Sequence, residues 1–387
     1  MELLCLLLYV TVNLACIEGY KWTRQNLPVL MDQNTQLLEQ SLFREQVENM
    51  NVGQFEKLCG IECQTSLPPL NQSEQERILG YETMYDNGTR THTDVRLRGL
   101  NTTESTSYVS SLTRTKRQVF GADGRFVISD LKFITNYPFA TAVRLSTGCS
   151  GVLVSSKHVL TAAHCIHDGR YYLESVKYLK VGVLHLKSKR GKRRRQRAVS
   201  KINQQNMKKR PVFRWIRVKQ TRIPQGWIHS KNSTTSLAAD YDYALLELKR
   251  GVKQKKFMDI GVAPRTFQPA RIHFSGYDDD KSLEGTQGGE KVVYRFCSVA
   301  KESKDLMYQH CDAQPGAAGA GVYVRLREDG GKGRWRRRVI GVFSGHRWVE
   351  VGGGEQRDFN VAVRITPAKY AQICHWIHKD PTQCKTV

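Results

Sequence analysis

Two short strings of the sequence carry residues suited to proton transfer. The first, Thr161-Ala-Ala-His-Cys165, ends a strand-like stretch on His164 and follows it with a cysteine. That cysteine can tie the strand end to a neighbour, and Cys149, sixteen residues earlier, is its natural partner. The second string opens with Asp242, directly before an apolar stretch that ends at Leu248. A histidine and a carboxylate delivered at strand ends could form a general-base pair.

These strings, in this order, resemble the trypsin-like serine proteases, which have the chymotrypsin fold. The resemblance implies that His164 is the general base, and that Asp242 orients this histidine and stabilises its imidazolium. It covers roughly Arg117 to the predicted C-terminal helix, about two thirds of the chain. Other strings, among them Cys59-Gly-Ile-Glu-Cys63 and residues 359–367, resemble one branch of the family and extend the match over nearly the whole chain.

The third residue of the family's triad is missing. The family carries its nucleophile in a Gly-Asp-Ser-Gly-Gly-Pro string before a strand, and the matching stretch here is Gly316-Ala-Ala-Gly-Ala-Gly-Val322. Ala318 stands at the position of the serine and Gly316 at the oxyanion-hole position. Ala317 replaces the aspartate that pairs with a newly cut N-terminus in the family. We therefore expect a vestigial triad of His164, Asp242 and Ala318, without proteolysis.

Alternatives to this interpretation stay open. If Ala318 were an engineered substitution or a sequence error, the chain would be an active trypsin-like endopeptidase. Ser344 could act as a remote nucleophile, but it matches the family's substrate-backbone strand, so we discount it. Asp312 falls six residues before Ala318, where trypsin-like members keep a pocket acid for Lys or Arg side chains. However, Gln314 stands where the family commonly has a cysteine, so the sequence around this pocket departs from the family's pattern.

The elements that must position these residues are short strands. Strand-like patterns occur at residues 141–145, 151–154, 159–162, 243–248, 321–326, 339–343 and 359–365. Thr366 and Pro367 begin a helix with an apolar face of Tyr370, Ile373, Cys374 and Ile377. The pattern and the resemblance together predict an all-β, trypsin-like double β-barrel with a C-terminal helix, preceded by a smaller pro-segment.

The N-terminal residues predict export. An apolar run within Met1 to Ala15 is too short to span a bilayer and suits a signal peptide, placed at residues 1–18, although a buried helix is the alternative. The basic quartet Arg114-Thr-Lys-Arg117 is a processing signal, with cleavage after Arg117. The predicted parts are therefore a pro-segment at 19–117 and a protease-like domain at 118–387. No later apolar run is long enough to predict a membrane helix.

Cysteines and sequons agree with an oxidising, extracellular compartment. Of the ten cysteines, eight remain after Cys5 and Cys16 are set aside with the signal peptide. Cys297 with Cys311, and Cys374 with Cys384, can form local bridges. The pair Cys59 and Cys63 lacks matching ligands, so we expect no metal and no cofactor. Four sequons predict glycosylation at Asn71, Asn87, Asn101 and Asn232.

One segment supplies most of the positive charge. Residues 187–222 hold 16 Lys or Arg and no acid, within a chain of net charge +24. Self-repulsion of this size predicts a basic surface insertion. The candidate polyanion-binding residues are Lys187, Lys189, Arg190, Lys192, Arg193, Arg194, Arg195 and Arg197. A solvated loop open to proteolysis is the other interpretation.

The sequence thus predicts a secreted pseudoprotease that binds extracellular proteins or protease inhibitors through the old cleft. An alternative is a matrix protein that binds sulfated glycosaminoglycans through the basic segment. Export argues against a nucleic-acid partner, and we expect no membrane partner.

Overall fold

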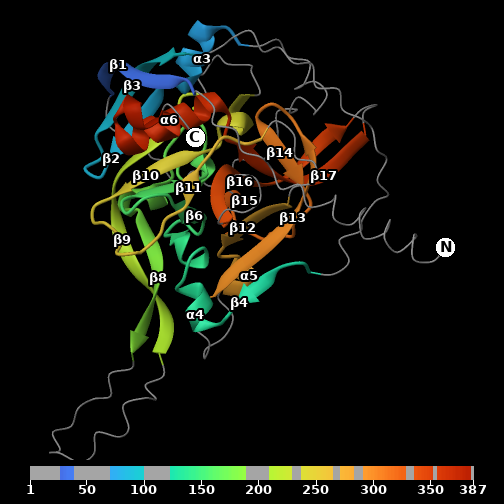
Figure 1. Ribbon diagram of the computed structural model, residues 1–387. Helices are drawn as coiled ribbons and strands as arrows, with labels where there is room; N and C mark the ends of the chain where they lie inside the picture. Colours follow the sequence, from blue (N-terminus) through green and yellow to red (C-terminus); the bar gives the residue numbers. More distant parts are fainter. Residues whose placement is uncertain are drawn as a thin grey trace, which may run out of the picture.

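Short strands joined by turns form two closed barrels that stand side by side (Figure 1). The computed structural model describes residues 27–38, 70–99, 123–188, 209–228, 237–264, 271–282, 291–327, 335–351 and 355–384. None of the helices in these ranges is long and apolar enough to cross a membrane.

The first barrel consists of antiparallel strands from the middle of the chain. They are β5 (Ala142–Leu145), β6 (Ser150–Leu153), β7 (His158–Thr161), β8 (Lys180–Ser188), β9 (Lys209–Pro224) and β10 (Ala244–Leu248). The barrel closes because β8 pairs with both β5 and β9. Its centre is filled by fully buried aliphatic side chains, including those of Val143, Leu153, Leu160, Val181 and Leu246.

The second barrel follows in sequence. Its strands are β12 (Arg271–Gly276), β13 (Val292–Glu302), β14 (Leu306–Gln309), β15 (Gly321–Arg327), β16 (Trp335–Val351) and β17 (Glu355–Arg364). Pairing of β16 with both β15 and β17 closes this barrel. Two short strands extend it, β4 (Phe126–Ile128) beside β13 and β11 (Asp259–Ile260) beside β16. The predicted all-β double barrel is confirmed.

Short helices connect or cap these strands. The α-helices are α3 (Gln72–Leu79), α4 (Leu131–Ile134), α5 (Asp279–Ser282) and α6 (Pro367–His378). The 3₁₀ turns are η1 (Phe139–Thr141), η2 (Ala163–Cys165), η3 (Glu174–Tyr178), η5 (Leu237–Tyr241) and η6 (Pro381–Cys384). The predicted helix start is confirmed, since the Thr366 side chain caps α6 and Pro367 occupies its first turn.

The leading segment is part of the first barrel's sheet. Its strands are β1 (Val29–Leu38), β2 (Tyr81–Tyr85) and β3 (Arg90–Arg98), and they continue the sheet in the order β1-β3-β2-β9. The first half of β9 pairs with β8, and its second half pairs with β2 over Gln220 to Pro224. Without β2, that half of β9 would be an open edge.

The leading segment also covers the C-terminal helix, as the adjoining blue and red elements of Figure 1 show. The ring of Tyr81 packs edge-on against Trp376 at 5.4 Å, and His375 Nε2 lies 2.9 Å from Asp32 Oδ1. Gln372 donates to the carbonyl oxygen of Leu79. Because of these contacts α6 is buried from Ala368 to Trp376, more than the single apolar face predicted from sequence.

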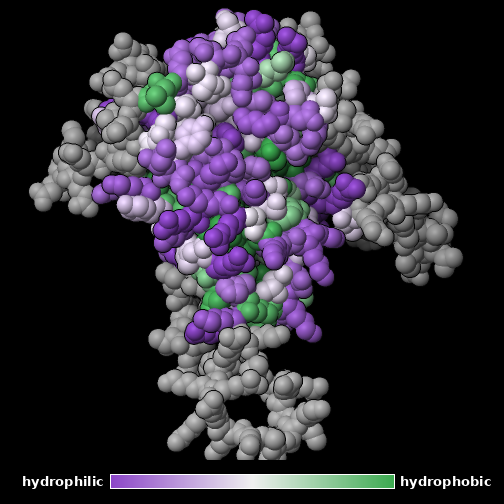
Figure 2. Space-filling view, turned by 90° about the vertical axis from the view of Figure 1, so that its left-hand side faces the viewer, coloured by the Kyte–Doolittle hydropathy of each residue, from purple (hydrophilic) through white to green (hydrophobic). Residues whose placement is uncertain are grey.

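The structure differs from the sequence prediction within the basic segment. Residues 209–222, predicted as part of a surface insertion, lie in β9 instead. Period-2 alternation explains this, since Ile216 and Val218 point inward while Arg217 and Lys219 point to solvent. The outer face of the first barrel is accordingly largely hydrophilic (Figure 2). Lys187 lies on β8, and residues 189–208 are outside the described ranges.

We expect the leading segment to remain bound after cleavage at Arg117. Strands β1–β3 are paired into the sheet, so cutting the connection breaks none of their described contacts. After cleavage of a Cys59→Ser/Cys63→Ser protein, which has no cysteine pair there to link the fragments, both fragments should co-elute in native gel filtration. Elution of the leading fragment alone would contradict this expectation.

The Asp32 site predicts an acid-dependent loss of stability. Burial raises the pKa of Asp32, but hydrogen bonding and the charges of His375 and Lys379 outweigh it and lower the pKa from 3.8 to about 2. A depressed carboxyl pKa stabilises the fold above pH 3.8, and this contribution is lost as the pH falls through about 2. Asp32→Asn should lower stability at pH 5 by about 1–2 kcal/mol, allowing for solvent screening, and by much less near pH 2. Urea unfolding at both pH values measures this, and an equal loss at both would contradict it.

Candidate active site

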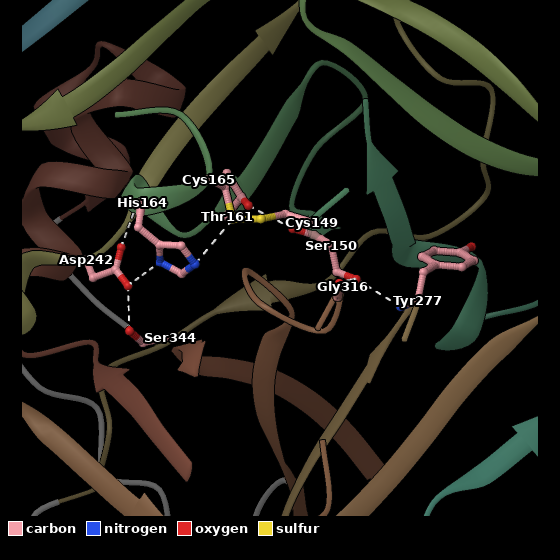
Figure 3. The surroundings of a disulfide bond; sticks show 9 residues. All are labelled: Cys149, Ser150, Thr161, His164, Cys165, Asp242, Tyr277, Gly316 and Ser344. Atoms are coloured by element: carbon pink, nitrogen blue, oxygen red, sulfur yellow. Dashed lines mark hydrogen bonds and ion pairs between the residues drawn. A yellow bond between two sulfur atoms is a disulfide. The ribbon is translucent and has the colours of Figure 1, made fainter. Parts of the chain in front are cut away.

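His164 and Asp242 meet at one end of the first barrel. Strands β7 and β10 pair antiparallel, with Thr161 opposite Ala244, so the turns η2 and η5 beside these residues are neighbours. His164 Nδ1 lies 2.7 Å from Asp242 Oδ2, and the His164 backbone N–H donates to Asp242 Oδ1 at 2.9 Å (Figure 3). The two residues predicted from the sequence are therefore joined by two contacts, one on each carboxylate oxygen of Asp242.

A residue of the second barrel completes the surroundings of Asp242. The Ser344 hydroxyl donates to Asp242 Oδ2 at 2.5 Å. Strand β16 has a register shift between Phe343 and Gly345, and such a bulge re-aims the side chain between them. Sequence reasoning matched Ser344 to the substrate-backbone strand but did not find this contact. Its hydroxyl is buried and occupied by Asp242, which argues against Ser344 as a nucleophile.

The Asp242 carboxyl is buried yet ionised. Burial by itself raises its pKa, but the charge and hydrogen bonds of His164, together with the Ser344 hydroxyl, hold the pKa below its usual value. When Nδ1 donates to this carboxylate, the neutral form of the His164 ring has its lone pair on Nε2. The side chain of His164 is 34% exposed, so that nitrogen can be approached from solvent.

The Cys149–Cys165 disulfide lies next to this histidine. Its S–S distance is 2.03 Å, and the predicted bridges Cys297–Cys311 and Cys374–Cys384 are also present. The Sγ atom of Cys165 lies 3.8 Å from His164 Nε2. Because both sulfurs at this place are oxidised, the group of Cys149, Cys165 and His164 offers no thiolate to a metal.

The loop with Ala318 lies against the strand that begins at Ser150. The Ser150 backbone N–H donates to the Ala318 carbonyl at 2.8 Å, and its hydroxyl donates to the Gly316 carbonyl at 2.7 Å. The same hydroxyl accepts from the Tyr277 N–H at 2.9 Å. A Cβ atom at Gly319, where φ is +84°, would lie 2.2 Å from the Thr161 hydroxyl, so only glycine fits. Ser150 thus fixes this loop to the first barrel.

Ala317 belongs to the apolar core of the second barrel. It is fully buried and clusters with side chains that include Ile272, Phe274, Val322 and Phe343. These four side chains are hydrocarbon and offer no hydrogen-bond donor to an aspartate at this position.

The start of the loop is held by a charge cluster that sequence reasoning missed. Asp278, fully buried, accepts from the Gln314 N–H at 3.1 Å and pairs with Arg125 at 3.1 Å and with Arg295. Asp280 binds the Arg125 guanidinium at 2.7 Å as well. Residue spacing gives no signal for this cluster, since its members lie on three separate segments.

Asp312, the candidate pocket acid, already has a hydrogen-bond donor. The Gly124 N–H donates to Asp312 Oδ2 at 2.7 Å. This carboxylate is therefore tied to the backbone just before β4, and its role toward a basic substrate stays a prediction.

The remaining candidate residues divide between surface and undescribed positions. Asn71 and Asn87 are exposed, the former as the N-cap of α3 and the latter in the β2–β3 turn. Arg117, Asn101, Asn232 and the basic residues from Lys189 to Arg197 lie outside the described ranges.

Comparison with known proteins identifies the family. The Trypsin family matches residues 130–310. Inactive serine protease 35 of Mus musculus is 46% identical over 94% of this chain and 93% of its own. The chain belongs to the trypsin family. Serine protease 23 of Homo sapiens is likewise 46% identical over 94% of this chain and 91% of its own.

A solved structure of Glu endopeptidase in complex with MPD has a TM-score of 0.45 and 18% identity, and covers 67% of this chain and 99% of that one. The names of the two similar proteins differ, because one is named an inactive serine protease and the other a serine protease.

We expect Ala317→Asp to destabilise the protein. An unpaired carboxylate in this apolar cluster should cost about 3 kcal/mol or more at pH 7. The loss of stability should shrink on acidification. Burial raises the pKa of the introduced carboxyl in the folded protein, and protonation then removes its charge. Urea unfolding at pH 7 and pH 4 tests this, with the neutral isostere Ala317→Asn as control. Equal losses for Asp and Asn at pH 7 would show that the site tolerates a charge.

Proposed function

We propose that this chain is a secreted, catalytically inactive trypsin-family protein that binds another extracellular protein at the former substrate cleft. The observation that carries the proposal is the alanine at position 318, where the family's string has its nucleophilic serine. The name of inactive serine protease 35 and the three disulfides within the described ranges support it.

Alanine removes the reaction rather than weakening it. The lone pair on His164 Nε2 could accept a proton from a serine hydroxyl, but a methyl group has no such proton and no attacking oxygen. Loss of a triad nucleophile costs about 10⁶-fold in turnover, or about 8 kcal/mol of barrier. The described hydroxyls nearby have other partners, since Ser344 binds Asp242 and Ser150 binds Gly316.

The surrounding frame remains suited to binding. His164 is oriented by Asp242, and Ser150 and Asp278 hold the loop from Gln314 to Gly319 without a free N-terminal amine. A preorganised cleft loses little conformational entropy when a partner enters. Because no acyl intermediate follows, the partner would be held reversibly. A protease inhibitor or a peptide segment of an extracellular protein fits this use.

We expect no covalent labelling of the wild-type protein by a fluorophosphonate probe and no turnover of Arg- or Lys-based peptides, before or after cleavage at Arg117. The Ala318→Ser variant should be labelled on its introduced hydroxyl, because His164 is already oriented. We expect its turnover to stay far below that of trypsin, since Ala317 supplies no carboxylate.

The control is Ala318→Ser/His164→Ala, which should lose the label. Wild-type turnover that disappears in His164→Ala would overturn the proposal, because it would show a working histidine-dependent nucleophile in the natural chain.

A further inference from the structure

Three arginines stand in a row across neighbouring strands of the second barrel. Arg325 of β15 is directly opposite Arg337 of β16. On the other side, β12 pairs with β15 through His273 and Tyr323, so Arg271 lies two residues further along, opposite Arg325. Alternation along strands puts all three on one face. Arg271 and Arg325 are exposed, and Arg337 is half-buried.

Each of these guanidinium groups lies near an aromatic ring. Arg271 lies 5.3 Å from the centre of the Phe296 ring and Arg325 lies 5.1 Å from that of Trp335. Arg337 lies 5.4 Å from the centre of the Tyr137 ring. Such cation–π contacts orient an arginine but leave its charge intact. The cluster is therefore positioned without being neutralised.

Among the residues that the structure describes, carboxylates do not compensate this charge. Within the described ranges, no acid forms an ion pair with Arg271, Arg325 or Arg337. Lys256 adds a further cation, with its ammonium 5.8 Å from the Tyr137 ring centre. Asp259 acts on Tyr137 electrostatically, but it stands beside Arg338 on the adjoining strand.

The pKa of the buried His273 responds to the positive charge of these arginines. Burial, followed by the charges of Arg325, Arg337 and Arg271, lowers its pKa from 6.5 to about 4. Like charges directly opposite one another also destabilise a sheet. An anion bound across the row would remove that repulsion. The planar guanidinium fork binds oxyanions through paired hydrogen bonds, which lysine cannot do.

We propose that Arg271, Arg325 and Arg337 form a binding site for a sulfated polysaccharide chain. Facing arginines on adjacent strands are roughly 5 Å apart at their Cβ atoms, so the row presents a line of forks to successive sulfates. The exposed ring of Trp335 borders this line and can pack against a sugar face, while Phe296 is already stacked on Phe126 and supports Arg271. Sulfated chains are the polyanions of the oxidising compartments in which disulfides such as those here persist.

The site continues toward the first barrel. A hollow of about 340 Å³ is lined by Ala140, Lys253 and Gln254 together with Arg214 of β9. Ala140 belongs to the same segment as Tyr137, and Lys253 and Gln254 belong to the same segment as Lys256, while Arg214 comes from β9 of the first barrel. A chain leaving Arg337 can therefore pass further cations. This inference does not depend on the cleft, so loss of protease activity neither supports nor excludes it.

The test measures binding of a heparin hexasaccharide by calorimetry in about 0.15 M salt and over a salt series. The protein to compare is the full chain with Arg271→Gln, Arg325→Gln and Arg337→Gln. A matched control removes the same charge at exposed positions elsewhere, through Arg96→Gln, Arg98→Gln and Arg170→Gln. All proteins carry glutamine in place of the seven basic residues between positions 189 and 197, so that these residues do not mask the result: Lys189, Arg190, Lys192, Arg193, Arg194, Arg195 and Arg197.

We expect the cluster variant to bind about tenfold or more weakly, with a salt slope smaller by roughly two, and the control to bind nearly as the parent does. Equal weakening in both variants would overturn the proposal. So would equal binding of desulfated heparin or of a single-stranded oligonucleotide of the same charge. If the triple variant fails to fold, as judged by thermal melting, Arg325→Gln alone, paired with Arg170→Gln, applies the same criterion.

Discussion

The buried carboxylate of Asp242 is the constraint on which the arrangement of the two barrels depends. A charged group with no exposure to water needs donors on its oxygens, and each donor comes from a fixed piece of backbone. His164 supplies two from the first barrel, and Ser344 supplies one from a bulge in the second. These requirements fix the distance between β7, β10 and β16. They hold whether or not a nucleophile is present, so they can keep the rest of the site in order in either case.

The parts of this structure that sequence could predict are those encoded locally. Apolar strands with period-2 patterns, the Thr366 cap and the Cys149–Cys165 bridge are each specified within a short stretch, and the structure contains them. The pairing of His164 with Asp242 was predictable for a different reason. Their two strings are distinctive enough to indicate the fold, and the fold makes the strands that deliver them neighbours.

What could not be predicted depends on long-range contacts. The density of charge in residues 209–222 concealed an alternating strand, because repulsion does not prevent strand pairing when most of the charged side chains, such as those of Arg214, Arg217 and Lys219, point to solvent. The Asp278 cluster joins Arg125, Arg295 and the Gln314 backbone, which no spacing rule connects. The polar and weakly periodic leading segment gave no indication that β2 would cover an edge of β9.

The contact between β1–β3 and α6 brings the two ends of the described chain to one place. Asp32 touches His375, and Tyr81 touches Trp376, although more than two thirds of the sequence separates them. A recombinant protein that began at Gln118, as a protease domain is often produced, would therefore expose aromatic and aliphatic surface on its last helix. Such surfaces promote self-association. Poor solubility of that fragment would then reflect a missing part of the fold and not an unstable barrel.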